Sequence, residues 1–193
     1  MAKYVTSGSG SDNATVAKWG VTVSGSADTF KKEYAKNDGS FTLAANTVVS
    51  TNDVVAPGTS GSMAAFTITG TPEVAVNVKF VGTLELGDKW VDSGSAYYCP
   101  IEITVGDTTF KGKEYSSAAL FETAVNGEIA SFTKNYAAKT DLSTIGADAP
   151  AISWAWAFTG NDDVKDTYLG NQAAGSNAAT IALSVTVTVT QID

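Results

Sequence analysis

Apolar and polar residues alternate strictly along residues 181–190, where the large apolar residues occupy the odd positions and small or hydroxylic residues the even ones. Only a β-strand, whose successive side chains point to opposite faces, places all the large residues of such a stretch on one face. The β-branched residues Val, Ile and Thr also suit a pleated, half-buried surface. We therefore expect a long strand in the interior of an antiparallel sheet, with Val185 and Val187 buried against the core.

The same alternation predicts shorter strands elsewhere in the chain. These lie at residues 15–23, 41–45, 66–68, 74–80, 84–86, 101–105 and 151–158. A turn at residues 70–72 makes the strands at 66–68 and 74–80 the clearest hairpin in the sequence. Pro57 and Gly58 suit the central positions of a type II turn.

The stretch 151–158 carries two of the four tryptophans. Trp154 and Trp156 share one strand face with Ile152 and Phe158, opposite small residues. A stripe of four large apolar side chains is far more typical of a core than of an exposed platform for a sugar.

One segment departs from the strand pattern. Residues 116–131 follow a serine cap, and Phe121, Val125 and Ile129 recur at a spacing of four, which predicts a helix that lies across one end or edge of the sheets. Gly127 is a weak point within it. Many short strands, Gly-rich turns and one main helix (about 116–131) predict a mainly β fold, a jelly-roll-like antiparallel β-sandwich.

The sequence divides into a short N-terminal segment, 1–11, and a single β-sandwich domain, 12–193. Tyr4, Val5 and Thr6 favour a strand, but the Gly/Ser linker at 8–11 separates them from the domain. Two interpretations remain open: a disordered terminus, or a tethered strand that pairs outside its own domain.

The composition excludes several classes of function. The chain has no histidine, its twelve basic residues are all lysines, and its net charge is −8. This removes imidazole bases, histidine-ligated zinc and bidentate arginine recognition of phosphate, and makes nucleic-acid or anionic-membrane binding unfavourable. Cys99, the single cysteine, sits in an apolar run and is expected to be a buried, inert thiol. No run is long and apolar enough to span a bilayer.

An acidic stretch supplies weak candidates for calcium ligands. Asn161, Asp162, Asp163 and Asp166 place oxygen ligands close together in the sequence, as calcium prefers, but without the EF-hand spacing. A solvated acidic loop is the commoner outcome of such a composition, so we expect no metal and no cofactor.

Several segments together resemble a known family. They are residues 2–7 (Ala-Lys-Tyr-Val-Thr-Ser), residues 11–21, residues 54–62 (Val-Val-Ala-Pro-Gly-Thr-Ser-Gly-Ser), Phe66-Thr-Ile, Pro72-Glu-Val-Ala-Val and residues 187–193. In their order and spacing they resemble the TasA/camelysin family of secreted proteins from Gram-positive bacteria, in particular its clostridial members.

The resemblance implies a jelly-roll subunit of extracellular biofilm-matrix fibres, secreted after removal of a signal peptide. It also implies that the N-terminal segment acts as a donor strand, which completes a sheet of the next subunit. The residues of this segment are Ala2, Lys3, Tyr4, Val5, Thr6 and Ser7. The partners would be copies of the same chain in a head-to-tail polymer, with other matrix components as possible additions, and neither nucleic acid nor a membrane.

Camelysin itself is described as a metalloprotease, but this chain lacks a His-Glu-x-x-His motif and any histidine. We therefore expect a structural protein and not an enzyme. The alternative is a secreted, cell-surface carbohydrate-binding β-sandwich module, with Trp154 and Trp156 as its candidate binding residues.

Overall fold

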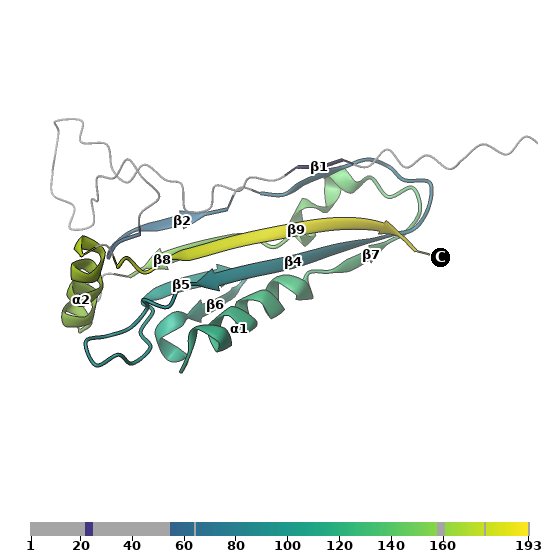
Figure 1. The fold of residues 1–193 in the computed structure, drawn as a ribbon. Coiled ribbons are helices and arrows are strands. Elements are labelled where there is room, and N and C mark those ends of the chain that lie inside the picture. Colours follow the sequence, from purple (N-terminus) through teal and green to yellow (C-terminus); the bar gives the residue numbers. More distant parts are fainter. Residues whose placement is uncertain (1–21, 25–54, 64, 158–160, 176, 193) are drawn as a thin grey trace, which may run out of the picture.

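The computed structural model describes residues 22–24, 55–63, 65–157, 161–175 and 177–192. They form a strand-rich fold with two larger antiparallel sheets and additional helices (Figure 1). One sheet has the order β2 (Ser60–Ser62), β8 (Ile152–Trp156), β5 (Ile101–Val105) and β6 (Thr108–Lys111). The other has the order β7 (Lys134–Tyr136), β4 (Val76–Leu86) and β9 (Ile181–Gln191). A short pair joins β1 (Thr22–Ser24) to β3 (Thr67–Thr69).

The core consists of the alternating apolar side chains of both sheets. It includes Ile101, Ile103, Val105, Ile152, Trp154 and Trp156 from the four-stranded sheet and Val76, Val78, Phe80 and Leu84 from the three-stranded sheet. Trp154 and Trp156 are only 3% and 4% exposed, which confirms them as core residues. Phe158 lies outside the described residues.

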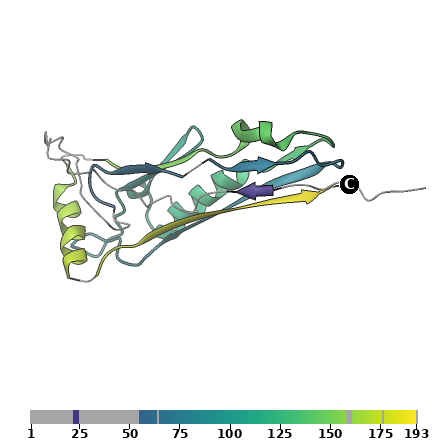
Figure 2. The same ribbon diagram turned by 90° about the horizontal axis from the view of Figure 1, so that it is seen from above.

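The predicted helix is confirmed as α1 (Ala118–Ser131). The side chain of Ser117 caps its N-terminus by accepting a hydrogen bond from the backbone N–H of Leu120. Phe121, Val125 and Ile129 are fully buried, as their spacing predicts. Figures 1 and 2 show α1 alongside β4, where it closes one side of the two sheets.

A second helix, α2 (Asp163–Ala174), corrects the expectation of an acidic loop, since the stretch 161–166 leads into a helix. The sequence gives little helical signal here because Leu169 is the buried residue of α2 and no apolar stripe accompanies it. Asp163 and Asp166 in the first turn favour the helix through its dipole. Two 3-10 helices, η1 (Gly112–Glu114) and η2 (Leu142–Asp148), complete the described elements.

The predicted hairpin is wrong. β3 pairs with β1, whereas β4 pairs with β7 and β9. The chain does turn near Gly70, whose φ is 128°, but Phe66 then meets Phe80 edge to face, with ring centroids 5.8 Å apart. The two segments thus contact one another through their apolar faces instead of pairing edge to edge.

Two smaller predictions hold. The turn at Pro57 and Gly58 is present, since Thr59 N–H donates to the carbonyl of Ala56 at 3.0 Å and the φ of Gly58 is 82°. Cys99 is fully buried, and burial raises the pKa of its thiol to about 12, so this thiol stays protonated and unreactive. Among the described residues, no helix has both the length and the apolar character needed to cross a membrane.

Candidate assembly site: the second edge of strand β9

Among the described residues, strand β9 is hydrogen-bonded along one edge only. It pairs with β4 over its full length, from Ile181 opposite Leu86 to Gln191 opposite Val76. Within the described part of the chain, no strand pairs with its second edge. The expectation that this strand lies in a sheet interior is therefore wrong for the described residues.

The other edge of β4, the one that faces away from β9, is covered by β7 and by side chains of the same chain. β7 pairs with the first three residues of β4. Further along β4, side chains of α1 and of Thr133 accept hydrogen bonds from backbone N–H groups of the strand. The backbone N–H groups of Leu84 and Leu86 donate to Asn126 Oδ1 at 2.8 Å and to Glu122 Oε1 at 2.7 Å. That of Phe80 donates to Thr133 Oγ1 at 3.3 Å. An edge of unpaired backbone groups is a template for another strand, and these side chains block it.

These bonds also identify the groups on the free edge of β9. In an antiparallel pair, a residue directs both its N–H and its C=O to the same neighbour. The even-numbered residues of β4 bond toward α1, so the odd-numbered ones bond to β9 and to its even-numbered residues, in line with the bond from Ile192 N–H to Ala75 C=O. The backbone groups on the free edge therefore belong to Leu183, Val185, Val187 and Val189.

The inward-facing side chains of β4 are more deeply buried than the valines of β9. On the inward face of β4, Val78, Phe80 and Leu84 are at most 2% exposed. Opposite Val78 and Phe80, Val189 and Val187 are only half-buried, whereas Leu183, opposite Leu84, is buried. Val185 is half-buried as well, so the expected burial of Val185 and Val187 is only partial. Both rows face the same core, and the greater exposure of the valines agrees with the finding that no described strand pairs with the second edge of β9.

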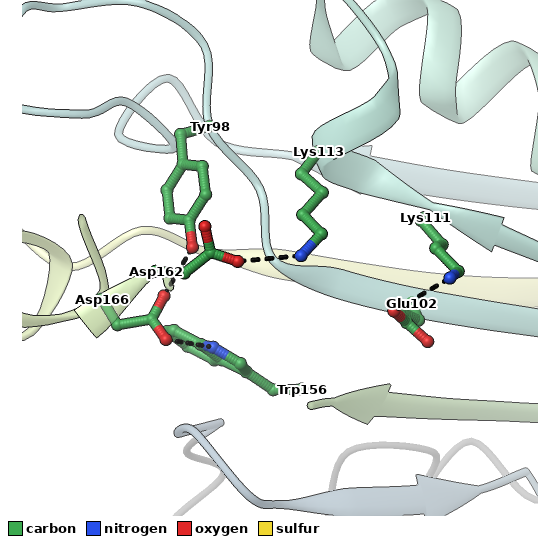
Figure 3. Close-up of polar contacts among 7 residues, drawn as sticks. All are labelled: Tyr98, Glu102, Lys111, Lys113, Trp156, Asp162 and Asp166. Atoms are coloured by element: carbon green, nitrogen blue, oxygen red, sulfur yellow. Dashed lines mark hydrogen bonds and ion pairs between the residues drawn. The ribbon is translucent and has the colours of Figure 1, made fainter. Parts of the chain in front are cut away.

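Helix α2 lies at the end of the sheets where β9 begins (Figures 1 and 2). Asp166 holds it there by accepting hydrogen bonds from the Tyr98 hydroxyl at 2.7 Å and from the Trp156 indole N–H at 3.3 Å (Figure 3). Lys113 Nζ lies 2.8 Å from Asp162 Oδ2. Burial raises the pKa of the Asp166 carboxyl, with a further contribution from Asp162, although its bond to Tyr98 opposes the shift.

The weak calcium candidates do not converge on a common point. Asp162 and Asp166 are engaged by the lysine, tyrosine and tryptophan just named, while Asn161 and Asp163 are exposed. The described residues contain no group of three or more acidic, histidine or cysteine side chains that could hold a metal ion. The arrangement stabilises the docking of α2.

The segment expected to act as a donor strand, residues 2–7, lies outside the described residues. The same holds for the boundary proposed at residue 11. The described residues thus present a strand edge without a described partner, and the donor strand stays a prediction from the sequence.

Comparisons with known proteins do not assign this chain to a family. No protein-family model matches it, and neither curated proteins nor solved structures give a match. The resemblance to the TasA/camelysin family therefore rests on the sequence motifs alone.

The open edge of β9 was not predicted from the sequence. Alternation shows which face of a strand is apolar but carries no information about which edge is paired. One signal was present for the covered edge of β4: Glu122 and Asn126 lie four residues apart, one helical turn, beside the buried stripe of α1. A polar row of this kind indicates a second contact of the helix, although not its partner.

Proposed function

We propose that this protein is a structural subunit of extracellular fibres, and that each subunit receives a strand from another copy of the same chain. The observation that carries the proposal is the second edge of β9: a strand of 11 residues, unpaired there within the described residues, above a row of half-buried valines. Strand addition derives its affinity from main-chain hydrogen bonds and its specificity from alternate side chains, and this edge offers both.

The donor in this proposal is residues 2–7, where the motif that resembles the TasA/camelysin family provides strand-forming residues on a flexible linker. A contact between two different surfaces of the same molecule that does not close on itself produces an open filament. The proposal includes the family's jelly-roll connectivity, secretion and a role in a biofilm matrix. The two sheets of the fold are compatible with that connectivity.

No observation favours the carbohydrate-binding alternative. Its candidate residues, Trp154 and Trp156, point into the core and cannot stack on a sugar ring. The proposal assigns no catalytic role, in keeping with a chain that contains no histidine.

The test is electron microscopy of concentrated protein in three forms: the full chain, a form lacking residues 2–7, and Tyr4→Asp. We expect fibres from the full chain, soluble monomers from the deletion and strongly slowed assembly from Tyr4→Asp. The loss of fibres must occur without loss of the fold, which circular dichroism of each form checks. Fibres of normal appearance from the deleted form, or no fibres from the full chain under any condition, would refute the proposed function.

A further inference from the structure

The sequence contains a single Asn-Gly pair, Asn126-Gly127, and this pair lies in α1, the helix that runs alongside β4 (Figures 1 and 2). An asparagine followed by glycine readily loses its side-chain amide, because glycine has no Cβ to keep its backbone nitrogen away from the preceding side chain. Every other asparagine of the chain is followed by a larger residue. The chemistry of this one pair therefore bears on the helix that covers an edge of β4.

The reaction of the pair needs only water and proceeds through a five-membered succinimide ring. The backbone nitrogen of Gly127 gives up its proton and bonds to Cγ of Asn126, while the bond from Cγ to the side-chain nitrogen breaks and ammonia leaves. Water then opens the ring at one of its two carbonyl carbons. Opening at Cγ gives aspartate, whereas opening at the backbone carbonyl gives isoaspartate, whose main chain runs through Cβ.

The docked helix engages both reacting groups. Oδ1 of Asn126 accepts a hydrogen bond from the backbone N–H of Leu84 at 2.8 Å, which directs this side chain toward β4. Gly127 lies inside α1, where helical geometry directs its N–H to the carbonyl oxygen of Thr123. Ring closure requires the side chain to leave Leu84 and the nitrogen to leave its helical bond. The reaction therefore requires a local opening of α1.

The position of the pair favours such an opening. Gly127 is exposed to water, and an added Cβ there would meet no atom within 4 Å. A glycine inside a helix weakens it by about 1 kcal/mol relative to alanine. The least stable position of α1 thus adjoins the asparagine that would react, and water reaches it without displacing the core.

Isoaspartate at position 126 is incompatible with the helix as it stands. It lengthens the main chain by one carbon atom between Val125 and Ile129, which are both fully buried and must lie on one face. It also displaces the oxygen that accepts from Leu84, and it disturbs the turn from which Glu122 accepts the N–H of Leu86 at 2.7 Å. Both of these backbone groups belong to the covered edge of β4.

We propose that Asn126-Gly127 is a latent modification site, at which isoaspartate forms after local opening of α1 and converts the covered edge of β4 into an open one. The proposal is independent of strand addition at β9. An open edge is a template for pairing with another chain, so the modified molecule gains a second surface for association. Ordinary aspartate at position 126 retains an oxygen that can accept from Leu84, so the isomer and not the added charge opens the edge.

Peptide mapping by mass spectrometry in mildly alkaline buffer measures the reaction, and labelling by isoaspartyl methyltransferase identifies the isomer. The samples are the wild type and Gly127→Ala, each folded and in urea. We expect folding to slow the wild type at least about tenfold, the factor that corresponds to about 1.4 kcal/mol of opening free energy. Gly127→Ala is expected to react slowly even in urea, where the stability of the helix does not contribute.

Equal rates for the folded and the unfolded wild type would overturn the protection by α1. Below the unfolding transition, the rate is expected to change little with urea, since a local opening exposes little surface. A rate that follows the globally unfolded fraction would overturn the local opening.

Hydrogen exchange at single amides tests the effect on the edge. The wild type is deamidated in urea, refolded and separated into its aspartate and isoaspartate forms. In the isoaspartate form we expect the amides of Leu84 and Leu86 to exchange at least about tenfold faster than in the unmodified protein, again the equivalent of about 1.4 kcal/mol. The amides of Thr83 and Glu85, which bond to β9, are expected to keep their protection. Asn126→Asp encodes the ordinary product and is expected to retain the protection of Leu84.

Unchanged exchange at Leu84 and Leu86 in the isoaspartate form would overturn the opening of the edge. Faster exchange at all four positions would show that the isomer unfolds the sheet as a whole, and it would overturn the proposal as well. Loss of protection in Asn126→Asp equal to that in the isoaspartate form would assign the effect to charge and contradict the role of the isomer.

Discussion

At Gly82, the backbone of strand β4 lies close to the side chain of Ile129 in helix α1. A Cβ atom built on Gly82 would lie 2.5 Å from Ile129 Cδ1 and 3.1 Å from Ile129 Cβ. Ile129 is fully buried, so its side chain has little space into which it could move. The absence of a side chain at this position allows α1 to lie against the strand whose edge it covers.

We therefore expect Gly82→Ala to lower the free energy of unfolding by about 1–3 kcal/mol, the usual cost of overpacking a core. Urea denaturation monitored by circular dichroism measures the change. The matched control is Gly127→Ala in α1, where an added Cβ meets no atom within 4 Å. This control is expected to stabilise the protein by about 0.5–1 kcal/mol, because alanine is the better helix former. Equal effects of the two substitutions would contradict the packing argument.

At the scale of elements, helices α1 and α2 are attached by different kinds of contact. α1 buries a stripe of three apolar residues, whereas α2 buries Leu169 and otherwise relies on polar contacts. The central one is Asp166, which accepts from Tyr98 and Trp156 in a partly desolvated position. The docking of α2 is thus expected to depend on pH.

Because the pKa of Asp166 is raised in the folded state above its ordinary 3.8, protonation favours the folded protein at this site. The stabilisation is complete below the unfolded-state pKa and is lost as the pH rises through the folded-state value. We expect the unfolding free energy of the wild type, minus that of Asp166→Asn, to increase as the pH falls from 7 and to level off near 3.8.

Chemical denaturation over a series of pH values measures this difference. Asp163→Asn removes an exposed carboxylate from the same helical turn and controls for the general loss of negative charge. A difference that shrinks as the pH falls would show that the hydrogen bonds from Tyr98 and Trp156 outweigh the desolvation of Asp166.

At the scale of the whole molecule, the net charge of −8 opposes the association of copies. In the proposed assembly, the edge of β9 that is unpaired among the described residues binds a strand through main-chain hydrogen bonds and apolar contacts, which salt hardly screens. Repulsion between the acidic bodies, in contrast, is long-range and is screened by salt.

Fibre growth is therefore expected to accelerate when the NaCl concentration rises from about 10 mM to about 150 mM, as the Debye length falls from about 30 Å to about 8 Å. Light scattering at fixed protein concentration follows the rate, and sucrose at equal osmolality is the control. Slower growth at the higher concentration would mean that an attraction between unlike charges, such as one made by Lys3, governs the encounter of copies.

The sequence by itself determined the main strands β4, β5, β8 and β9, the apolar face of each, and the position of α1. It did not predict the short strands β2, β6 and β7, and the strand predicted at residues 41–45 lies outside the described residues. The properties that it determined are local: a period of two or of about four, repeated over several residues, is sufficient to define the buried face. The burial of Trp154, Trp156, Phe121 and Ile129 followed directly from such periods.

Only the tertiary structure decided which strand edges meet. Every residue other than proline carries the same backbone donor and acceptor, so the edges of β4 and β9 are indistinguishable in the sequence. The partner of β4 lies about a hundred positions along the chain, and the side chains that cover its outer edge come from a helix in between. Even for β9, whose alternation was the most regular, the sequence did not reveal the pairing, and its second edge is the site from which the function is proposed.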